Sequence, residues 1–233
     1  MFATTMRHGR FHGRSEGARL LAERALAYLP EAAGQSILDL GCGTGDLAVA
    51  LKRDRPDSRV TGIDFSLANV EAARARTDAI LFHFGDYLHW QGGPFAMIVA
   101  DSVLHLIEGP FDAVASKIAG DLAQNGLLVA TVPDNCLQNR LLMLARRLYR
   151  LTPPVTDSLV VRLAMLLHPG LSREVLTDRM PYMRNLPRLF GAREQSVFAR
   201  MGLHLEHAEP LANPSLAKPR HCLMVWRRGP VAV

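Results

Sequence analysis

Cysteine is scarce in this sequence, with three residues among 233: Cys42, Cys136 and Cys222. They stand far apart and form no CxxC spacing, which argues against a disulfide framework or a zinc cluster. No stretch approaches the ~20 apolar residues of a membrane span. The N-terminal arginines are not followed by the apolar run of a secretory signal. These absences predict a cytoplasmic chain that is not an integral membrane protein.

Several catalytic signatures are also missing. The sequence has no GxSxG motif and no Cys/His arrangement that indicates covalent catalysis. Its nine histidines form no metal-ligand spacing beyond His8 and His12, which have no acidic third ligand nearby. We therefore predict no metal site. The absence of internal repeats, together with the chain length, favours one domain.

Charge is distributed unevenly along the chain. Residues 31–133 carry 7 Lys/Arg and 13 Asp/Glu, whereas residues 134–200 carry 11 and 5. The segments 1–30 and 201–233 are also net positive. Two interpretations are open. The basic flanks are arginine-rich helices that face water, or they face an anionic partner.

Short apolar runs alternate with stretches of helical periodicity. Five strands are expected over residues 36–40, 59–63, 79–84, 95–100 and 126–132. Helices are expected between them, and two final strands near residues 204–211 and 222–226. This alternation implies βαβ units in a parallel sheet with helices on both faces. The predicted fold is α/β, a doubly wound and mostly parallel seven-stranded sheet.

The most informative run is the apolar stretch 37–40 followed by Gly41-Cys42-Gly43-Thr44-Gly45. A buried strand here leads into a turn with almost no side chains, where glycine takes backbone angles closed to other residues. A ligand can lie directly against such a backbone. Open α/β sheets bind ligands at this end of a strand. The turn has neither the GxGxxG spacing of a dinucleotide site nor a P-loop lysine.

The segment from Asp39 to Gly45 resembles motif I of the class I S-adenosylmethionine-dependent methyltransferases. The second strand, which ends at Asp64, fits the same family, and the resemblance covers residues 34–133 well. It implies S-adenosylmethionine as cofactor and S-adenosylhomocysteine as product. Asp39, Gly41, Cys42 and Gly43 are implied to form the cofactor turn. Asp64 is implied to accept hydrogen bonds from both ribose hydroxyls.

The resemblance extends to the ends of the third and fourth strands. Asp86 is implied to accept from the adenine amino group, and Phe65 or Tyr87 to pack on the adenine ring; core packing is the alternative for both aromatics. Asp101 and Ser102 are implied to border the methionine part of the cofactor. The nearby His105 stands where a general base could reach an acceptor hydroxyl or amine, with a packing histidine as the alternative.

The chain divides into four parts around this core. Residues 1–33 are expected to form an N-terminal helical cover, 34–134 the cofactor-binding core, 135–190 a helical insertion after the fifth strand, and 191–233 a C-terminal helix with the final strands. Within the insertion, Leu137, Leu141, Leu144 and Leu148 mark one face of an amphipathic helix. Residues 159–167 are apolar nearly all round apart from Arg162, so we expect them to be buried or covered. The insertion and the N-terminal segment should cover the carboxyl ends of the strands and hold the substrate.

The segment 101–105 resembles that of small-molecule methyltransferases and lacks the Asn/Asp-Pro-Pro-aromatic motif of amino-methylating nucleic-acid enzymes. We expect methyl transfer to an O-, N- or C-nucleophile of a small molecule that is hydrophobic and anionic. Secondary metabolism is one hypothesis for the setting. An RNA methyltransferase and a cofactor-binding member with another reaction stay open, while glycine spacing argues against a nicotinamide-dependent oxidoreductase. Docking on an anionic membrane surface is also open, and no oligomeric state is predicted.

Overall fold

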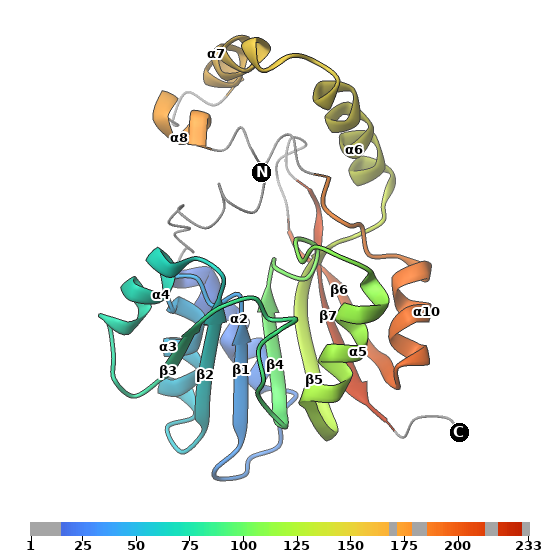
Figure 1. The fold of residues 1–233 in the computed structure, drawn as a ribbon. Helices are drawn as coiled ribbons and strands as arrows, with labels where there is room; N and C mark the ends of the chain where they lie inside the picture. Colours follow the sequence, from blue (N-terminus) through green and yellow to red (C-terminus); the bar gives the residue numbers. More distant parts are fainter. Residues whose placement is uncertain (1–14, 168–171, 179–185, 213–218, 230–233) are drawn as a thin grey trace.

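The computed structural model describes residues 15–167, 172–178, 186–212 and 219–229. Seven strands form one sheet in the order β3-β2-β1-β4-β5-β7-β6. They are β1 (Ser36–Leu40), β2 (Arg59–Asp64), β3 (Leu81–Phe84), β4 (Phe95–Asp101), β5 (Leu122–Pro133), β6 (Leu203–Pro210) and β7 (His221–Arg228). All pairings are parallel except those of β7, which runs antiparallel to β5 and β6. The predicted doubly wound α/β fold is confirmed (Figure 1).

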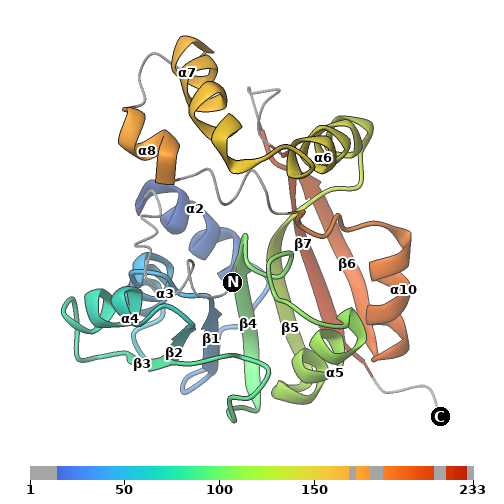
Figure 2. The same cartoon turned by 45° about the horizontal axis from the view of Figure 1, so that its top comes forward.

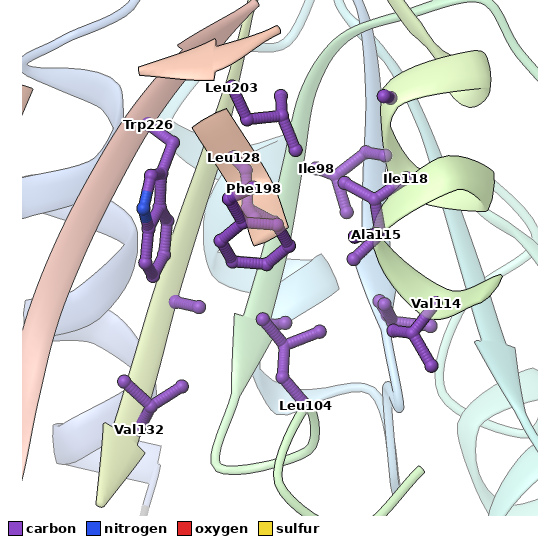
Figure 3. Packing of buried hydrophobic residues seen from close by; sticks show 14 of the residues in the cluster. Ile98, Leu104, Val114, Ala115, Ile118, Leu128, Val132, Phe198, Leu203 and Trp226 are labelled. Carbon is purple, nitrogen blue, oxygen red and sulfur yellow. The ribbon is translucent and has the colours of Figure 1, made fainter. Parts of the chain in front are cut away.

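Helices cover both faces of the sheet. On one face lie α2 (Ser15–Leu26), α3 (Asp46–Asp54) and α4 (Leu67–Arg74); on the other lie α5 (Phe111–Asp121) and α10 (Ala192–Arg200). Alternate strand residues supply the two faces, so Ile37 packs under the first group and Leu38 under the second. Figure 3 shows the second core, where Phe198 lies against Trp226 at a ring-centroid distance of 4.9 Å.

Local sequence explains where the helices near the site begin. The Ser66 side chain accepts a hydrogen bond from the Asn69 amide at 3.4 Å and caps α4. Gly45 precedes α3 with a φ of 84° and no side-chain cap. The amide groups at the start of α3 therefore face the glycine turn without a competing side chain of the cap residue.

The segment after β5 forms α6 (Leu137–Arg150), the short helix η1 (Pro154–Thr156), α7 (Asp157–Leu167) and α8 (Arg173–Asp178). It leaves and rejoins the sheet at one place, because the Phe190 amide donates to the Pro133 carbonyl at 2.8 Å and the Asn135 amide to the Phe190 carbonyl at 3.1 Å. Figures 1 and 2 show these helices above the carboxyl ends of the parallel strands. None of the described helices is long and apolar enough to cross a membrane.

The expectation that residues 159–167 are buried is wrong for the side chains that the structure describes. Leu159 is 68% exposed and Leu166 is 79% exposed, whereas Val161 is buried. The reason is that α7 packs on α8 along a narrow contact between Val161 and Leu176. Although α7 is apolar on nearly all sides, it therefore buries little of its surface.

Candidate active site at the switch point of the sheet

The loops that follow β1 and β4 meet at the point where the strand order reverses. β1 and β4 are parallel neighbours, while β2 continues from β1 on the other side. Open α/β sheets bind their ligands in the crevice at such a point. The two loops touch: a Cβ on Gly41 would lie 2.3 Å from Cγ2 of Val103. The loop after β4 thus leaves no room for a side chain at Gly41.

The glycine turn is held in a backbone shape that only glycine adopts readily. Gly41, Gly43 and Gly45 have φ angles of 72°, 52° and 84°, in the region where other residues meet steric strain. The Ile63 carbonyl accepts from the amides of Gly41 and Cys42 at 2.8 and 3.0 Å. β2 therefore fixes the turn, and the turn presents bare backbone to the crevice.

Asp64 ends β2 and is buried beneath the same turn. Its Oδ2 accepts from the Gly43 amide at 2.9 Å and its Oδ1 from the Ser66 amide at 2.8 Å, with the Asn69 amide group at 3.4 Å. Burial raises the pKa of Asp64, and these donors act against that effect. A carboxylate offers about four acceptor positions. Three are engaged, so this conformation leaves room for one further donor such as a ribose hydroxyl.

Asp39 is the most unusual carboxyl group of the site. It is buried, and its Oδ2 has no hydrogen-bond partner. Burial first, and the charge of Asp101 second, raise its pKa to about 8, although an Ala48 backbone hydrogen bond acts in the opposite direction. The Asp39 carboxyl is therefore mainly protonated at neutral pH. A cation brought into the crevice would stabilise its ionised form.

Two residues of the predicted cofactor site point into the core. Cys42 is buried among the side chains between β1 and α3, and burial raises the pKa of its thiol. Tyr87 is buried under the Lys117 ammonium group, 5.0 Å from the ring centroid. Burial and the nearby Asp121 raise the Tyr87 pKa. In this arrangement Cys42 offers a ligand its backbone, and the Tyr87 ring is enclosed by protein.

Two other predicted residues lie at the surface of the same edge. Phe65 follows Asp64 directly and is 36% exposed, so its ring is available to a planar ligand. Asp86 is also exposed, but its Oδ1 accepts from the Leu88 amide at 3.0 Å and its Oδ2 lies 3.0 Å from Nδ1 of His89. The Asp86 carboxylate is therefore already engaged in hydrogen bonds within the turn that follows β3.

Asp101 and Ser102, after β4, are tied to a residue that sequence reasoning missed. Oγ1 of Thr131, on β5, donates to Oδ1 of Asp101 at 2.5 Å and accepts from the Ser102 amide at 2.8 Å. Ser102 has a φ of 56°, a strained conformation that needs such support and recurs at functional sites. A signal existed, because Thr131 is a polar residue inside a buried apolar strand.

His105 lies near a second histidine that the sequence did not single out. Its ring meets that of His221 edge-on, with centroids 5.6 Å apart. Burial, His221 and Arg146 together lower the His105 pKa to about 3, and its Nδ1 is buried without a partner. Burial also lowers the His221 pKa, while its Nδ1 lies 3.1 Å from the Pro219 carbonyl. Both rings are neutral at physiological pH.

Two cavities flank the histidine pair. The larger, about 900 Å³, contains His105 and lies between the loop after β4, α6 and α10. The smaller, about 250 Å³, contains Asp101, Ser102, Thr131 and His221. Among the predicted residues, the structure thus brings His105 to one cavity and Asp101 with Ser102 to the other. The glycine turn and Asp64 line neither of these two cavities and lie beside them at the same edge.

The larger cavity has a mixed lining of apolar, cationic and acidic side chains. Leu106, Ile107, Phe111 and Val197 line it together with Arg147, Arg188 and Arg193. The Arg188 guanidinium stacks 4.8 Å from the centroid of the Phe111 ring, and its Nη1 is buried without a hydrogen-bond partner. Burial lowers the Arg188 pKa. A buried cation with an unused donor favours an anionic ligand.

The acidic groups of this cavity are partly engaged elsewhere. Asp112 forms an ion pair with Arg200 at 3.0 Å, and the Glu194 carboxylate accepts from the Gly191 amide at 3.1 Å. Within the described residues, Arg147 and Arg193 form no ion pair that would neutralise them. Glu108 also lines the cavity, so the lining contains three arginines and three carboxyl groups. The unused donor of Arg188 is the feature that favours an anion there.

Comparison with known proteins agrees with this geometry. Residues 37–126 match the family model described as methyltransferase domain. A trans-aconitate 2-methyltransferase of Paracidovorax citrulli is 33% identical over 117 residues, which is 49% of this chain and 45% of that protein. One from Escherichia coli is 31% identical over 128 residues, or 54% and 50%. The chain thus spans about half the length of the curated relatives it matches.

Solved structures extend the similarity to nearly the whole fold. The magnesium protoporphyrin IX methyltransferase of Synechocystis, with bound S-adenosylhomocysteine, superposes with a TM-score of 0.58 over 97% of this chain and 93% of its own, at 14% identity. The N-methyltransferase NodS of Bradyrhizobium japonicum gives 0.58 over 91% and 86%, at 16% identity. At these identities the likeness concerns the fold. Residues 37–126 match the methyltransferase-domain model, and the sheet and helices around them have the fold of these methyltransferases.

Proposed function

We propose that this protein transfers a methyl group from S-adenosylmethionine to a small molecule that carries a carboxylate or another anionic group. The observation that carries the proposal is the meeting of the glycine turn, the buried carboxyl of Asp39 and the carboxylate of Asp64 at the switch point of the sheet. Bare backbone, a buried acid whose Oδ2 has no partner and an acid with one open acceptor position fit a cationic ligand with a sugar.

The residues divide the cofactor between them in this proposal. Gly41 and Gly43 leave space for it, Asp64 accepts from the ribose, and Phe65 packs on the base. Asp101 and Ser102 border its methionine part, close to the carboxyl of Asp39, whose pKa responds to Asp101. The roles proposed for Asp86 and Tyr87 near the adenine require the turn after β3 to open, since both side chains are engaged within the protein. When bound, the cofactor supplies an activated methyl group on a sulfonium.

The acceptor is proposed to lie in the larger cavity, next to His105. A methyl transfer needs little beyond an acceptor held in line at contact distance, and a base only when the nucleophile carries a proton. His105, with a pKa of about 3, is a weak base. This favours an acceptor that arrives ionised, toward which His105 acts by contact and by accepting hydrogen bonds. A carboxylate meets that condition.

The arginines of the cavity support the same choice. Arg147, Arg188 and Arg193 face apolar side chains, and planar guanidinium groups suit carboxylates. The matched relatives are called trans-aconitate 2-methyltransferases, a name that refers to an organic acid. We propose that the acceptor of this chain belongs to the same chemical class: an anion that also has an apolar part. A role in secondary metabolism stays a hypothesis, because no observation on this chain bears on it.

The cofactor proposal is tested by isothermal titration with S-adenosylmethionine, S-adenosylhomocysteine and NAD. We expect heat from both sulfur ligands and none from NAD. A thermal shift provides the second measurement, since a ligand at 100 times its Kd stabilises the native state by ~2.7 kcal/mol. Stabilisation by NAD alone would exclude the methyltransferase proposal.

The acceptor proposal is tested with matched pairs of carboxylic acids and their amides, using methyl transfer as readout. We expect the acids to react and Arg193→Met to raise KM for them by about tenfold, as the loss of one charge-assisted contact implies. Arg173→Met, on α8 and outside the cavity, is the control. Equal rates for acids and amides would show that the arginines do not select the acceptor.

A further inference from the structure

The leucine face of α6 points away from the protein. Leu137, Leu141, Leu144 and Leu148 recur at helical spacing, and each is more than half exposed. The side chains that α6 buries are Asn139 and Met143. The Asn139 amide group donates to the carbonyls of Asp134 and Arg220 at 2.6 and 2.8 Å. The helix is thus anchored by its polar side, and its apolar side is left outside.

Exposed apolar side chains continue along the chain beyond α6. Leu151 and Val155, in the connection to α7, are 82% and 78% exposed, and Leu159, Leu163 and Leu166 of α7 follow at helical spacing. Figures 1 and 2 both place α6 and α7 at the rim of the molecule, away from the sheet. Isolated exposed leucines are ordinary, but four on one face of a single helix, with further exposed apolar residues next to it in the chain, mark an interaction surface.

The charges on α6 indicate what kind of surface it meets. The helix contains four arginines and no acidic residue. Arg140, Arg147 and Arg150 are exposed, and at helical spacing none of them falls on the leucine row. A strongly amphipathic helix with leucines on one face and arginines on the other is the composition that lies in the headgroup region of an anionic bilayer. A second copy of this helix would instead bring like charges together.

We propose that α6, with the adjoining apolar residues up to Leu166, docks this protein on an anionic lipid surface, with the leucine row in the acyl boundary and the arginines at the headgroups. Docking through this face brings the larger cavity, which Met143 and Arg147 of α6 help to line, close to the membrane. The proposal concerns the surface alone and does not depend on the methyltransferase activity.

The test is cosedimentation of the full chain with vesicles of phosphatidylcholine alone and of phosphatidylcholine with 30% phosphatidylglycerol. We expect binding to the anionic vesicles that weakens with salt, because charge attraction is screened. The double variant L144E/L148E should lower the partition coefficient more than tenfold, since each substitution removes a buried side chain and adds a charge. R150Q should lower it about fivefold.

Leu20→Glu is the matched control, because Leu20 is a similarly exposed leucine on another helix, 46% against 52% for Leu144. It should bind vesicles like the wild type, and thermal unfolding should show all variants folded. Absence of wild-type binding, or equal binding by L144E/L148E, would overturn the proposal. Light scattering after size exclusion distinguishes the rival occupant: a dimer that L144E/L148E dissociates, without vesicle binding, would assign the face to a second copy.

Discussion

At the residue scale, the site depends on carboxyl groups whose environments differ sharply. Asp39 and Asp64 are buried, while Asp86 and Asp101 are exposed. Burial penalises the charged form of a carboxyl group, so the first two are sensitive to what enters the crevice. The pKa of an exposed carboxylate such as Asp86, which already accepts from a backbone amide, responds much less to a bound ligand. This difference determines which substitutions should affect cofactor binding.

Asp64→Ala should weaken S-adenosylhomocysteine binding more than Asp86→Ala. The Asp64 carboxylate supports the Gly43 amide and keeps one acceptor position free, whereas Asp86 is engaged with Leu88 and His89. A hydrogen bond to a charged group contributes ~1.5–3 kcal/mol, which corresponds to a loss of affinity of about 10- to 150-fold. Isothermal titration measures both variants. Equal affinity of Asp64→Ala and wild type would refute the assignment.

His105 should make stability depend on pH. Its pKa falls from 6.5 in the unfolded chain to about 3 in the folded state, so between these values the unfolded chain binds more protons. Stability contributed by neutral His105 is present above pH 6.5 and is lost as pH falls, by up to ~1.4 kcal/mol per pH unit. His105→Asn should reduce the loss between pH 7 and pH 5, measured by urea unfolding. Identical slopes for variant and wild type would contradict the burial of a neutral ring.

At the element scale, the site depends on contacts between loops that follow different strands. β2 fixes the turn after β1 through the Ile63 carbonyl, and β5 fixes the turn after β4 through Thr131. Side chains within the loops contribute only short local bonds, Thr44 to Asp46 and Ser102 to Asp101. The positions of Gly41 and Ser102 relative to each other are therefore properties of the sheet.

Thr131→Val should lower methyl transfer by about tenfold while leaving global stability within ~1–2 kcal/mol. Valine keeps the volume of the buried side chain but removes the hydroxyl that bonds to Asp101 and Ser102, and a hydrogen bond of this kind contributes ~0.5–1.5 kcal/mol or more when charged. Thr131→Ser is the control that keeps the hydroxyl. We expect Ser to retain most of the activity. Similar rates for Val and Ser would show that the hydroxyl does not position the loop.

At the scale of the whole molecule, the protein consists of a sheet, which holds the proposed cofactor site, and a helical segment after β5 that lies above one edge of the sheet. The chain leaves at Asn135 and returns at Phe190, where the two are hydrogen-bonded. The proposed cofactor residues all lie before the insertion, whereas Asn135, Met143, Arg147 and residues 186–189 from within it line the larger cavity. Binding of cofactor and acceptor should therefore be separable.

Replacing residues 136–189 by a short Gly/Ser linker should leave S-adenosylhomocysteine affinity within about threefold of wild type. The ends of the segment are already in contact, so the linker closes a small loop at little entropic cost. Methyl transfer to an anionic acceptor should be lost with the wall of the cavity. Titration calorimetry and a methylation assay measure the two effects. Loss of cofactor binding in a folded variant would show that the insertion also builds the cofactor site.

The sequence by itself determined the alternation of strands and helices, the glycine turn and the acids at the ends of the strands. These features follow from local patterns: apolar runs, helical spacing and backbone angles that glycine favours. Asp64 and Ser66 were predictable in this way, because each acts next to its own strand or helix. The insertion of residues 135–190 was also visible, as a break in the alternation.

Only the tertiary structure decided the rest. Thr131 pairs with Ser102, and His221 approaches His105, although the members of each pair lie far apart in the sequence. The burial of Tyr87 likewise follows from no local pattern. The orientation of α6 and α7 was decided in the same way. Periodicity shows that a helix has an apolar face, but it cannot show whether the protein or its surroundings cover that face. Here Asn139 anchors the polar side of α6 to the backbone beside β7, and so turns the leucines outward.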